Sequence, residues 1–221
     1  TIRFATRNDG KWDVHDVFKA NEPYENGLKL IIDNNNAPHI ACCSMWENGI
    51  KYAYFDNASK KWLIEVLVVD ESVTAIDLLC IGNDPFLVFR NKLNQLKYMY
   101  REKGIWISNI LDNDLITDWG LKFVRTADNE MQVLYPTKSS WKLAIIKEKQ
   151  IHKYETLPLG NPDTTEAFLL RTANDSFDIF CLSMKQNNMF RLNYYKSPNW
   201  ENVEAEYKIM HGHFLNPYKC I

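Results

Sequence analysis

One strand-sized pattern recurs along the chain at nearly constant spacing, and this recurrence limits the possible fold more than any other feature. Its first copy occupies residues 28–67, where four short runs are joined by turns rich in Asn, Asp, Gly and Ser. The runs read LKLIID, PHIACC, IKYAYF and KKWLIEVL. Each run has the length of a strand, and none has the 3.6-residue spacing of an amphipathic helix. The copy therefore predicts four consecutive β-strands.

The same runs return three more times. The second run begins at Pro38, Pro85, Met131 and Phe177, so consecutive copies are separated by 47, 46 and 46 residues. The first run returns as IDLLCI, LKFVRT and FLLRTA, and the third run returns as LKYMYR, WKLAII and FRLNYY. A unit of this length with four strands is typical of a β-propeller blade.

The two ends of the chain supply the parts of one further unit. IRFATR at 2–7 matches a third run and GKWDVHDV at 10–17 a fourth run, whereas MHGHFL and PYKCI near the C-terminus match first and second runs. A ring closed by strand pairing between its ends leaves no open sheet edge, which explains this division. We therefore predict an all-β fold: a five-bladed β-propeller with four-stranded antiparallel blades, whose closing blade is shared between the N- and C-termini. The blades of this single domain, 1–221, are expected at about 28–67, 76–111, 121–157, 167–206, and 208–221 together with 1–18.

A β-sandwich or barrel with coincidental spacing is the alternative, because both also consist of short strands with frequent turns. The first copy, with its D-NNN-A-PHI … IKYAY … W pattern, resembles the repeats of sialidase-like β-propellers. TRNDGKW at 6–12 and DNASKKW at 56–62 approximate the Asp-box of that family, although the first is one residue short and the second lacks the Gly. In overall plan the chain also resembles the five-bladed lectins of the horseshoe-crab type.

Composition narrows the class further. With a net charge of −2, the chain is not a generally basic protein that coats nucleic acid. No apolar run approaches the roughly 20 residues that span a membrane. An odd number of cysteines without CxxC spacing argues against a zinc site and a dense disulfide framework. Buried free thiols are expected, with one or two bridges as the alternative, and a secreted or cell-surface location is slightly favoured. The cysteines are Cys42, Cys43, Cys80, Cys181 and Cys220.

The loops between the last strand of one blade and the first strand of the next are acidic. They hold eleven Asp and Glu residues against Lys19 and Lys208. Such a surface attracts a cation, an amine or a basic partner, although hydrated charged loops are common without any ligand. Three aromatic residues are expected on the same face. The predicted binding residues are Trp46, Trp119, Asp112, Asp114, Asp118 and Tyr24.

Four tryptophans recur with the repeat, which indicates a structural role, whereas sugar stacking between blades is the alternative reading. They are Trp12, Trp62, Trp106 and Trp200. His39 is expected to be a packing residue that bonds to backbone. His211 and His213 lie two residues apart, so both face one side of an expected strand and could join a metal site. No third ligand is visible, and we predict no metal or cofactor.

We predict a non-catalytic recognition module that binds a protein or glycan partner, possibly basic, on the loop face. Neither nucleic acid nor a membrane span is expected. One alternative is a repeat-type lectin with sugar sites between blades. Another is a glycoside hydrolase, which would need two carboxylates about 5–10 Å apart near the axis. Asp77, Asp118 and Glu166 are the candidates for such a pair, but no catalytic residue is assigned.

Overall fold

Eighteen β-strands make up the regular structure of the described part of the chain. The computed structural model describes residues 1–21, 23–44, 47–67, 72–115, 121–126, 130–159, 165–171, 177–185, 189–196 and 201–205. Within these ranges there is no helix long and apolar enough to cross a membrane. In chain order the strands are β1 (Ile2–Asn8), β2 (Lys11–Phe18), β3 (Pro23–Ile32), β4 (Pro38–Ser44), β5 (Glu47–Asp56), β6 (Lys61–Leu67), β7 (Val73–Ile81), β8 (Asp84–Asn91), β9 (Leu96–Glu102), β10 (Ile105–Asp112), β11 (Lys122–Arg125), β12 (Met131–Pro136), β13 (Trp141–Lys147), β14 (Gln150–Leu157), β15 (Thr165–Arg171), β16 (Phe177–Lys185), β17 (Met189–Lys196) and β18 (Glu201–Ala205).

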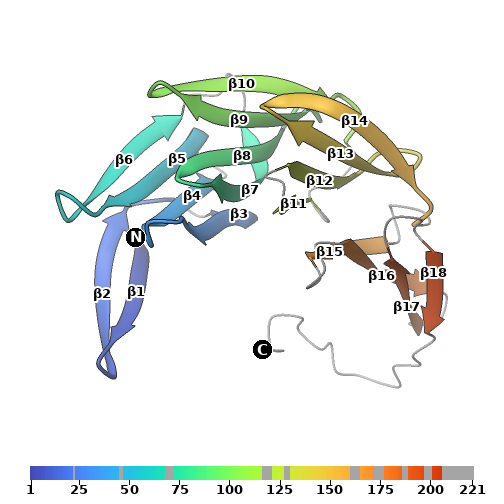
Figure 1. Ribbon diagram of the computed structural model, residues 1–221, viewed down its shortest axis with the longest axis horizontal. Helices are drawn as coiled ribbons and strands as arrows, with labels where there is room; N and C mark the ends of the chain where they lie inside the picture. The colour runs from blue at the N-terminus through green and yellow to red at the C-terminus, as the bar shows by residue number, and fades with distance from the viewer. Residues whose placement is uncertain are drawn as a thin grey trace.

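The strands form four antiparallel four-stranded sheets and one hairpin. The sheets are β3–β6, β7–β10, β11–β14 and β15–β18, each with its strands in sequence order, and β1 pairs with β2. Figure 1 shows the four sheets placed around a common centre, with β3, β7 and β11 on the inner side and β6, β10 and β14 on the outer side. This all-β arrangement is a β-propeller, as predicted, and each of the four sheets is a four-stranded antiparallel blade. We call these sheets blades one to four.

Local sequence explains which strands are inner and which are outer. The inner strand β7, VTAIDLLCI, is almost continuously apolar and is buried along most of its length, as expected for a strand covered on both faces. The outer strand β6, KWLIEVL, is mostly exposed. Two-residue turns with positive φ at both residues join the third and fourth strands in several places, as at Asp9-Gly10 and Lys103-Gly104. Asp-Gly suits this geometry because it tolerates positive φ.

Each hydrophobic core lies between two neighbouring blades. Between blades one and two, Ile50 and Tyr52 pack with Leu78 and Leu87. A second core joins blades two and three, and a third joins blades three and four. The blades are therefore held together face to face by their apolar side chains.

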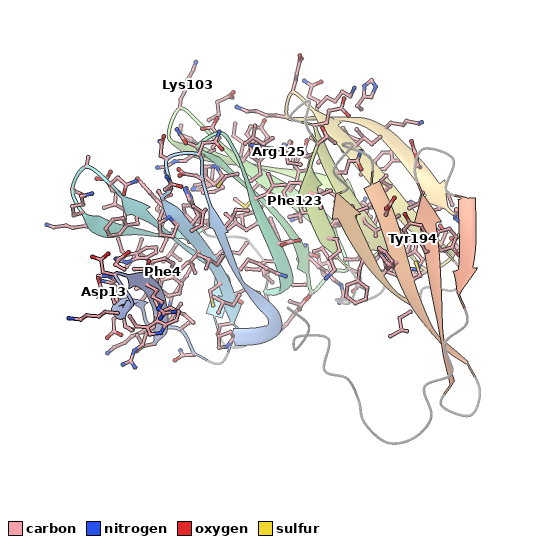
Figure 2. All side chains as sticks on the ribbon, turned by 60° about the horizontal axis from the view of Figure 1, so that its bottom comes forward. Phe4, Asp13, Lys103, Phe123, Arg125 and Tyr194 are labelled. Carbon is pink, nitrogen blue, oxygen red and sulfur yellow. The ribbon has the colours of Figure 1, made fainter. Side chains whose placement is uncertain are left out.

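The N-terminal part of the predicted closing blade forms the hairpin β1–β2, and its place in a fifth blade stays a prediction. Its Phe4, shown in Figure 2, contacts Trp62 of blade one edge to face, with 5.5 Å between ring centroids. Val17 and Phe18 pack with Ile40 in the same cluster. The two strands predicted near the C-terminus lie outside the described residues.

The structure also tests the packing predictions. Trp62 and Trp106 pack as expected against Phe55 and Tyr52. Trp12 does not, because 68% of it is exposed on a hairpin that contacts blade one along a single face. Trp200 lies outside the described residues. The four described cysteines are buried and form no disulfide bond among themselves, as predicted.

Candidate functional site

One cavity lies between blades one and two. It has a volume of about 470 Å³ and opens at the edge formed by the β3–β4, β5–β6 and β7–β8 turns. Blade one provides most of its wall, and blade two contributes the β7–β8 turn and one arginine. We call it the first cavity. Its lining residues are Asp33, Asn35, Ala37, His39, Tyr52, Tyr54, Phe55, Asp56, Asn57, Ala58, Asn83, Asp84, Pro85 and Arg101.

Three polar side chains joined by hydrogen bonds, Asp33, His39 and Tyr52, form the inner wall of the first cavity. Asp33 begins the β3–β4 turn, where its Oδ1 accepts hydrogen bonds from the backbone amides of Asn35 and Ala37, both at 2.8 Å. Its Oδ2 lies 3.2 Å from His39 Nε2, and His39 Nδ1 lies 2.5 Å from the Tyr52 hydroxyl. Because a carboxylate only accepts, Nε2 carries the hydrogen, and Nδ1 then accepts from the hydroxyl of Tyr52.

Burial and hydrogen bonding set the protonation states of these three side chains. The side chains of His39 and Asp33 are only 4% and 6% exposed. Burial lowers the pKa of His39 against the opposing effect of Asp33. Burial by itself would raise the pKa of Asp33, but the Ala37 amide and His39 outweigh it and hold that pKa below its usual value. Burial also raises the pKa of Tyr52. At neutral pH Asp33 is therefore an ionised carboxylate, His39 a neutral imidazole and Tyr52 a neutral phenol.

Aromatic rings cover the next part of the wall. His39 and Tyr54 are stacked with centroids 5.9 Å apart and an interplanar angle of 20°. The Arg101 guanidinium of blade two lies 5.9 Å from the centroid of the Tyr54 ring. Glu65 of blade one holds Arg101 at 3.0 Å and also accepts a hydrogen bond of 2.8 Å from Trp106 Nε1. A cation–π contact and a shared carboxylate thus join the two blades at the cavity.

This constellation could be read from the sequence only in part. The third runs IKYAYF and LKYMYR share a Tyr-X-Tyr alternation, which places both tyrosines on one face of a strand. In blade one that face lines the first cavity. The prediction that His39 bonds to backbone was wrong, because its two ring nitrogens bond to side chains brought together by the β3–β4 turn and the β4–β5 pairing.

The predicted acidic face lies at the opposite edge of the blades from the first cavity. Asp112 accepts hydrogen bonds from the Tyr135 hydroxyl at 3.0 Å and from Lys142 Nζ at 2.8 Å. Burial opposes them, but Lys142 and Tyr135 hold the pKa of Asp112 below its usual value. Asp114 is paired with Lys138 at 3.1 Å. These two carboxylates have partners within the chain.

The other predicted binding residues are not placed by the structure. Trp46, Trp119 and Asp118 lie outside the described residues, and Tyr24 lies in β3, where its side chain is not described. A binding site built from these residues with Asp112 and Asp114 stays a prediction.

Asp77 is the one described carboxylate among those predicted near the axis. It lies on β7, accepts a hydrogen bond of 2.9 Å from the Phe123 amide of β11 and lies 3.8 Å from Lys29 Nζ of β3. Burial raises its pKa, although Lys29 opposes this. Figure 2 shows Phe123 on β11, beside Arg125. Asp77 therefore links three inner strands.

The structure does not describe the side chains of the other residues considered for catalysis or metal binding. The carboxyl group of Glu166 is not described, and His211 and His213 lie outside the described residues. Within the described ranges, no three His, Cys, Asp or Glu side chains are grouped to hold a metal ion.

Comparisons with known proteins identify the fold. No protein-family model matches the chain, and no curated protein matches it. Among solved structures, the chain is similar to AofleA from Arthrobotrys oligospora, with 10% identity and a TM-score of 0.59 over 91% of this chain and 64% of that chain. It is also similar to the SapL1 lectin in complex with alpha methyl fucoside, with 11% identity and a TM-score of 0.58. That match covers 93% of this chain and 73% of the lectin chain. A third similar structure is the alpha-L-arabinofuranosidase PaAbf62A from Podospora anserina in complex with cellotriose, with 10% identity and a TM-score of 0.52. That match covers 90% of this chain and 70% of the arabinofuranosidase chain.

These likenesses concern the propeller fold alone, because the identities are near 10%. The chain spans less than two thirds of the length of AofleA.

Proposed function

We propose that this protein is a non-enzymatic, glycan-binding β-propeller that holds a sugar residue in the first cavity. The observation that carries the proposal is the combination of aromatic side chains and fixed polar groups that line one cavity between blades. Tyr54 contributes an aromatic ring, Arg101 offers hydrogen-bond donors, and Asp56 and Asp84 offer acceptors.

A sugar needs this mixture. Its hydroxyls both donate and accept hydrogen bonds, and its ring carries C–H groups that pack on aromatic faces. A cavity of about 470 Å³ lies within the range of small-ligand sites. The polar groups are also held in place before a ligand arrives, because Glu65 fixes Arg101 and the β3–β4 turn fixes Asp33. Such preorganisation reduces the entropy cost of binding.

Two further observations bear on the proposal. A lectin in complex with a methyl fucoside and an arabinofuranosidase are both among the proteins of similar fold, which agrees with glycan binding but does not separate binding from catalysis. Asp77 accepts hydrogen bonds from the amides of Leu78 and Phe123 and faces Lys29, which is a structural role.

A glycan array followed by titration calorimetry tests the proposal, with methyl α-fucoside and cellotriose as the first soluble probes. Tyr54→Ala and Arg101→Ala should each weaken binding at least about tenfold, which corresponds to ~1.4 kcal/mol. Lys103→Ala is the matched control, because Lys103 projects from the β9–β10 turn of the same blade (Figure 2) and does not line the cavity.

Thermal melts should show that the three variants remain folded. Unchanged affinity in both cavity variants would contradict the proposal, as would a glycan array on which the protein binds nothing. Turnover of a chromogenic glycoside would assign the protein to the enzyme class instead.

A further inference from the structure

We infer that a second sugar site, with a more apolar inner wall, lies between blades two and three. The inference rests on the proposed function, since it extends the same mode of binding to another junction. A second cavity of about 340 Å³ lies there, which we call the second cavity. Its lining residues are Ile81, Asp84, Phe86, Glu130, Met131, Lys147, Glu148 and Lys149.

The aromatic geometry beside the two cavities is nearly the same. In blade one, His39 is paired across the strands with Tyr54, and in blade two Phe86 is paired with Tyr100. The centroid distances of these pairs are 5.9 and 6.0 Å. The adjacent tyrosine pairs, Tyr52 with Tyr54 and Tyr98 with Tyr100, are also alike at 6.0 and 6.2 Å.

The following blade places a cation over the outer ring in both cases. Arg101 of blade two lies 5.9 Å from the Tyr54 centroid, and Lys149 of blade three lies 5.0 Å from the Tyr100 centroid. Each cation is held by a carboxylate of the preceding blade, Glu65 at 3.0 Å and Glu102 at 3.1 Å. The repeat therefore reproduces a ring, a cation and a carboxylate at two successive junctions.

The next junction lacks this arrangement. One repeat further along the chain, Ala144 and Ile146 of β13 replace the tyrosine pair, and both are fully buried in the core. Blade three therefore presents no aromatic ring at this position, whereas blade four again pairs two rings across its strands, Phe180 with Tyr194, with centroids 4.9 Å apart.

The inner wall of the second cavity indicates which sugars it would take. Phe86 replaces His39, and Ile81 and Met131 complete an apolar surface. Such a surface favours a sugar that carries a methyl group, either an N-acetyl group or the methyl of a 6-deoxy sugar. Burying one methyl-sized group is worth about a fourfold gain in affinity.

Backbone amide shifts in an NMR titration with methyl α-L-fucoside or N-acetylglucosamine can locate the sites. We expect shifts at Glu130 and Lys147, beside the second cavity, that persist in Tyr54→Ala. Shifts confined to the neighbourhood of the first cavity would overturn the second site and leave the proposed function standing. Absence of shifts at both cavities would overturn both.

Matched sugars test the preference for a methyl group in the Tyr54→Ala variant, where the second cavity acts alone. Methyl α-L-fucoside is compared with methyl α-L-galactoside, in which a hydroxymethyl group replaces the methyl group, and N-acetylglucosamine is compared with glucose. We expect a preference of about fourfold for the methyl-bearing member of at least one pair, and a smaller preference in Phe86→His. Equal affinities within both pairs would refute this part of the inference.

A second inference concerns an uncovered apolar face on blade one. Three side chains of β3 point to the same side of the strand and are exposed: Leu28 at 45%, Leu30 at 55% and Ile32 at 48%. The side chains between them are engaged elsewhere, since Ile31 packs between blades one and two and Lys29 faces Asp77. The hairpin β1–β2 covers the neighbouring part of blade one, through Ile40 and Trp62, and leaves this face open.

We propose that residues 206–221 of this chain cover that face and pair with the edge of β1 that β2 leaves open, completing the fifth blade of a single domain. Their segments MHGHFL and PYKCI have the length of strands and supply apolar side chains. In the repeat these segments correspond to the first two strands of a blade. The hairpin β1–β2 corresponds to the last two, so together they would make four strands.

Hydrogen exchange of the full chain tests this closure, with the outer strands β6, β10 and β14 as internal controls. The amides of β1 that do not bond to β2 should exchange much more slowly than the outward amides of the controls. Equal exchange would refute the closure. Light scattering that shows a dimer, with protection of β1 only at high concentration, would assign the face to a second copy instead.

Discussion

Replacing Asp33 with Ala should destabilise the protein strongly, because one carboxylate serves both the β3–β4 turn and the wall of the first cavity. The change removes an acceptor from the amides of Asn35 and Ala37 and from His39 Nε2. Hydrogen bonds to a charged group are worth about 1.5–3 kcal/mol each and do not add fully. We expect a loss of about 3 kcal/mol in the free energy of unfolding, which lowers Tm by roughly 6–12 °C for a chain of this size.

Urea denaturation monitored by tryptophan fluorescence measures this loss, and Asp56→Ala is the matched control. Asp56 also accepts from two turn amides, those of Ala58 and Ser59 at 3.2 and 3.0 Å, but it is only partly buried and has no histidine partner. The Asp33 variant should therefore be clearly the less stable of the two. Equal stability of the two variants would refute the view that the buried Asp33–His39–Tyr52 chain is a structural part of the cavity.

Three further predictions follow from the same contacts. Because its folded-state pKa is lowered, Asp33 contributes stability that is present above about pH 4 and is lost as the pH falls through the lowered pKa. Asp33→Asn should therefore reduce the loss of unfolding free energy between neutral and acidic pH. An unchanged loss would contradict this prediction. Tyr135→Phe removes a hydrogen bond to Asp112 and should cost about 1 kcal/mol in urea denaturation, whereas no loss would show the bond to be unimportant. Burial raises the pKa of Cys80 and Cys181 to about 12, so iodoacetamide at pH 8 should label them only in urea, and peptide mass spectrometry that finds native labelling would refute their burial.

The strand pattern could be predicted because its causes are local. Alternating apolar residues and turn residues recur at 46 or 47 residues, and every predicted run that falls within the described residues is a strand. The inner and outer position of a strand also followed from its sequence, since inner strands such as β7 are apolar on both faces.

The candidate site could not be predicted in the same way, because its residues belong to different blades. Tyr54 and Arg101 are separated along the chain by a whole repeat, and only the packing of blade one on blade two brings the guanidinium over the ring. Composition pointed to the acidic loops, yet charge counts do not show whether a carboxylate already has a partner. Asp112 is held by Tyr135 and Lys142, which come from the next blade.

By itself the sequence determined the strands, their order within each blade and the length of the repeat, because hydrophobic alternation and turn chemistry act between near neighbours. Only the tertiary structure decided that His39 bonds to Asp33 and Tyr52, that Trp12 is exposed whereas Trp62 is packed, and that two cavities lie between neighbouring blades. These features depend on distances between side chains far apart in the sequence, which are set when the apolar faces of neighbouring blades pack together.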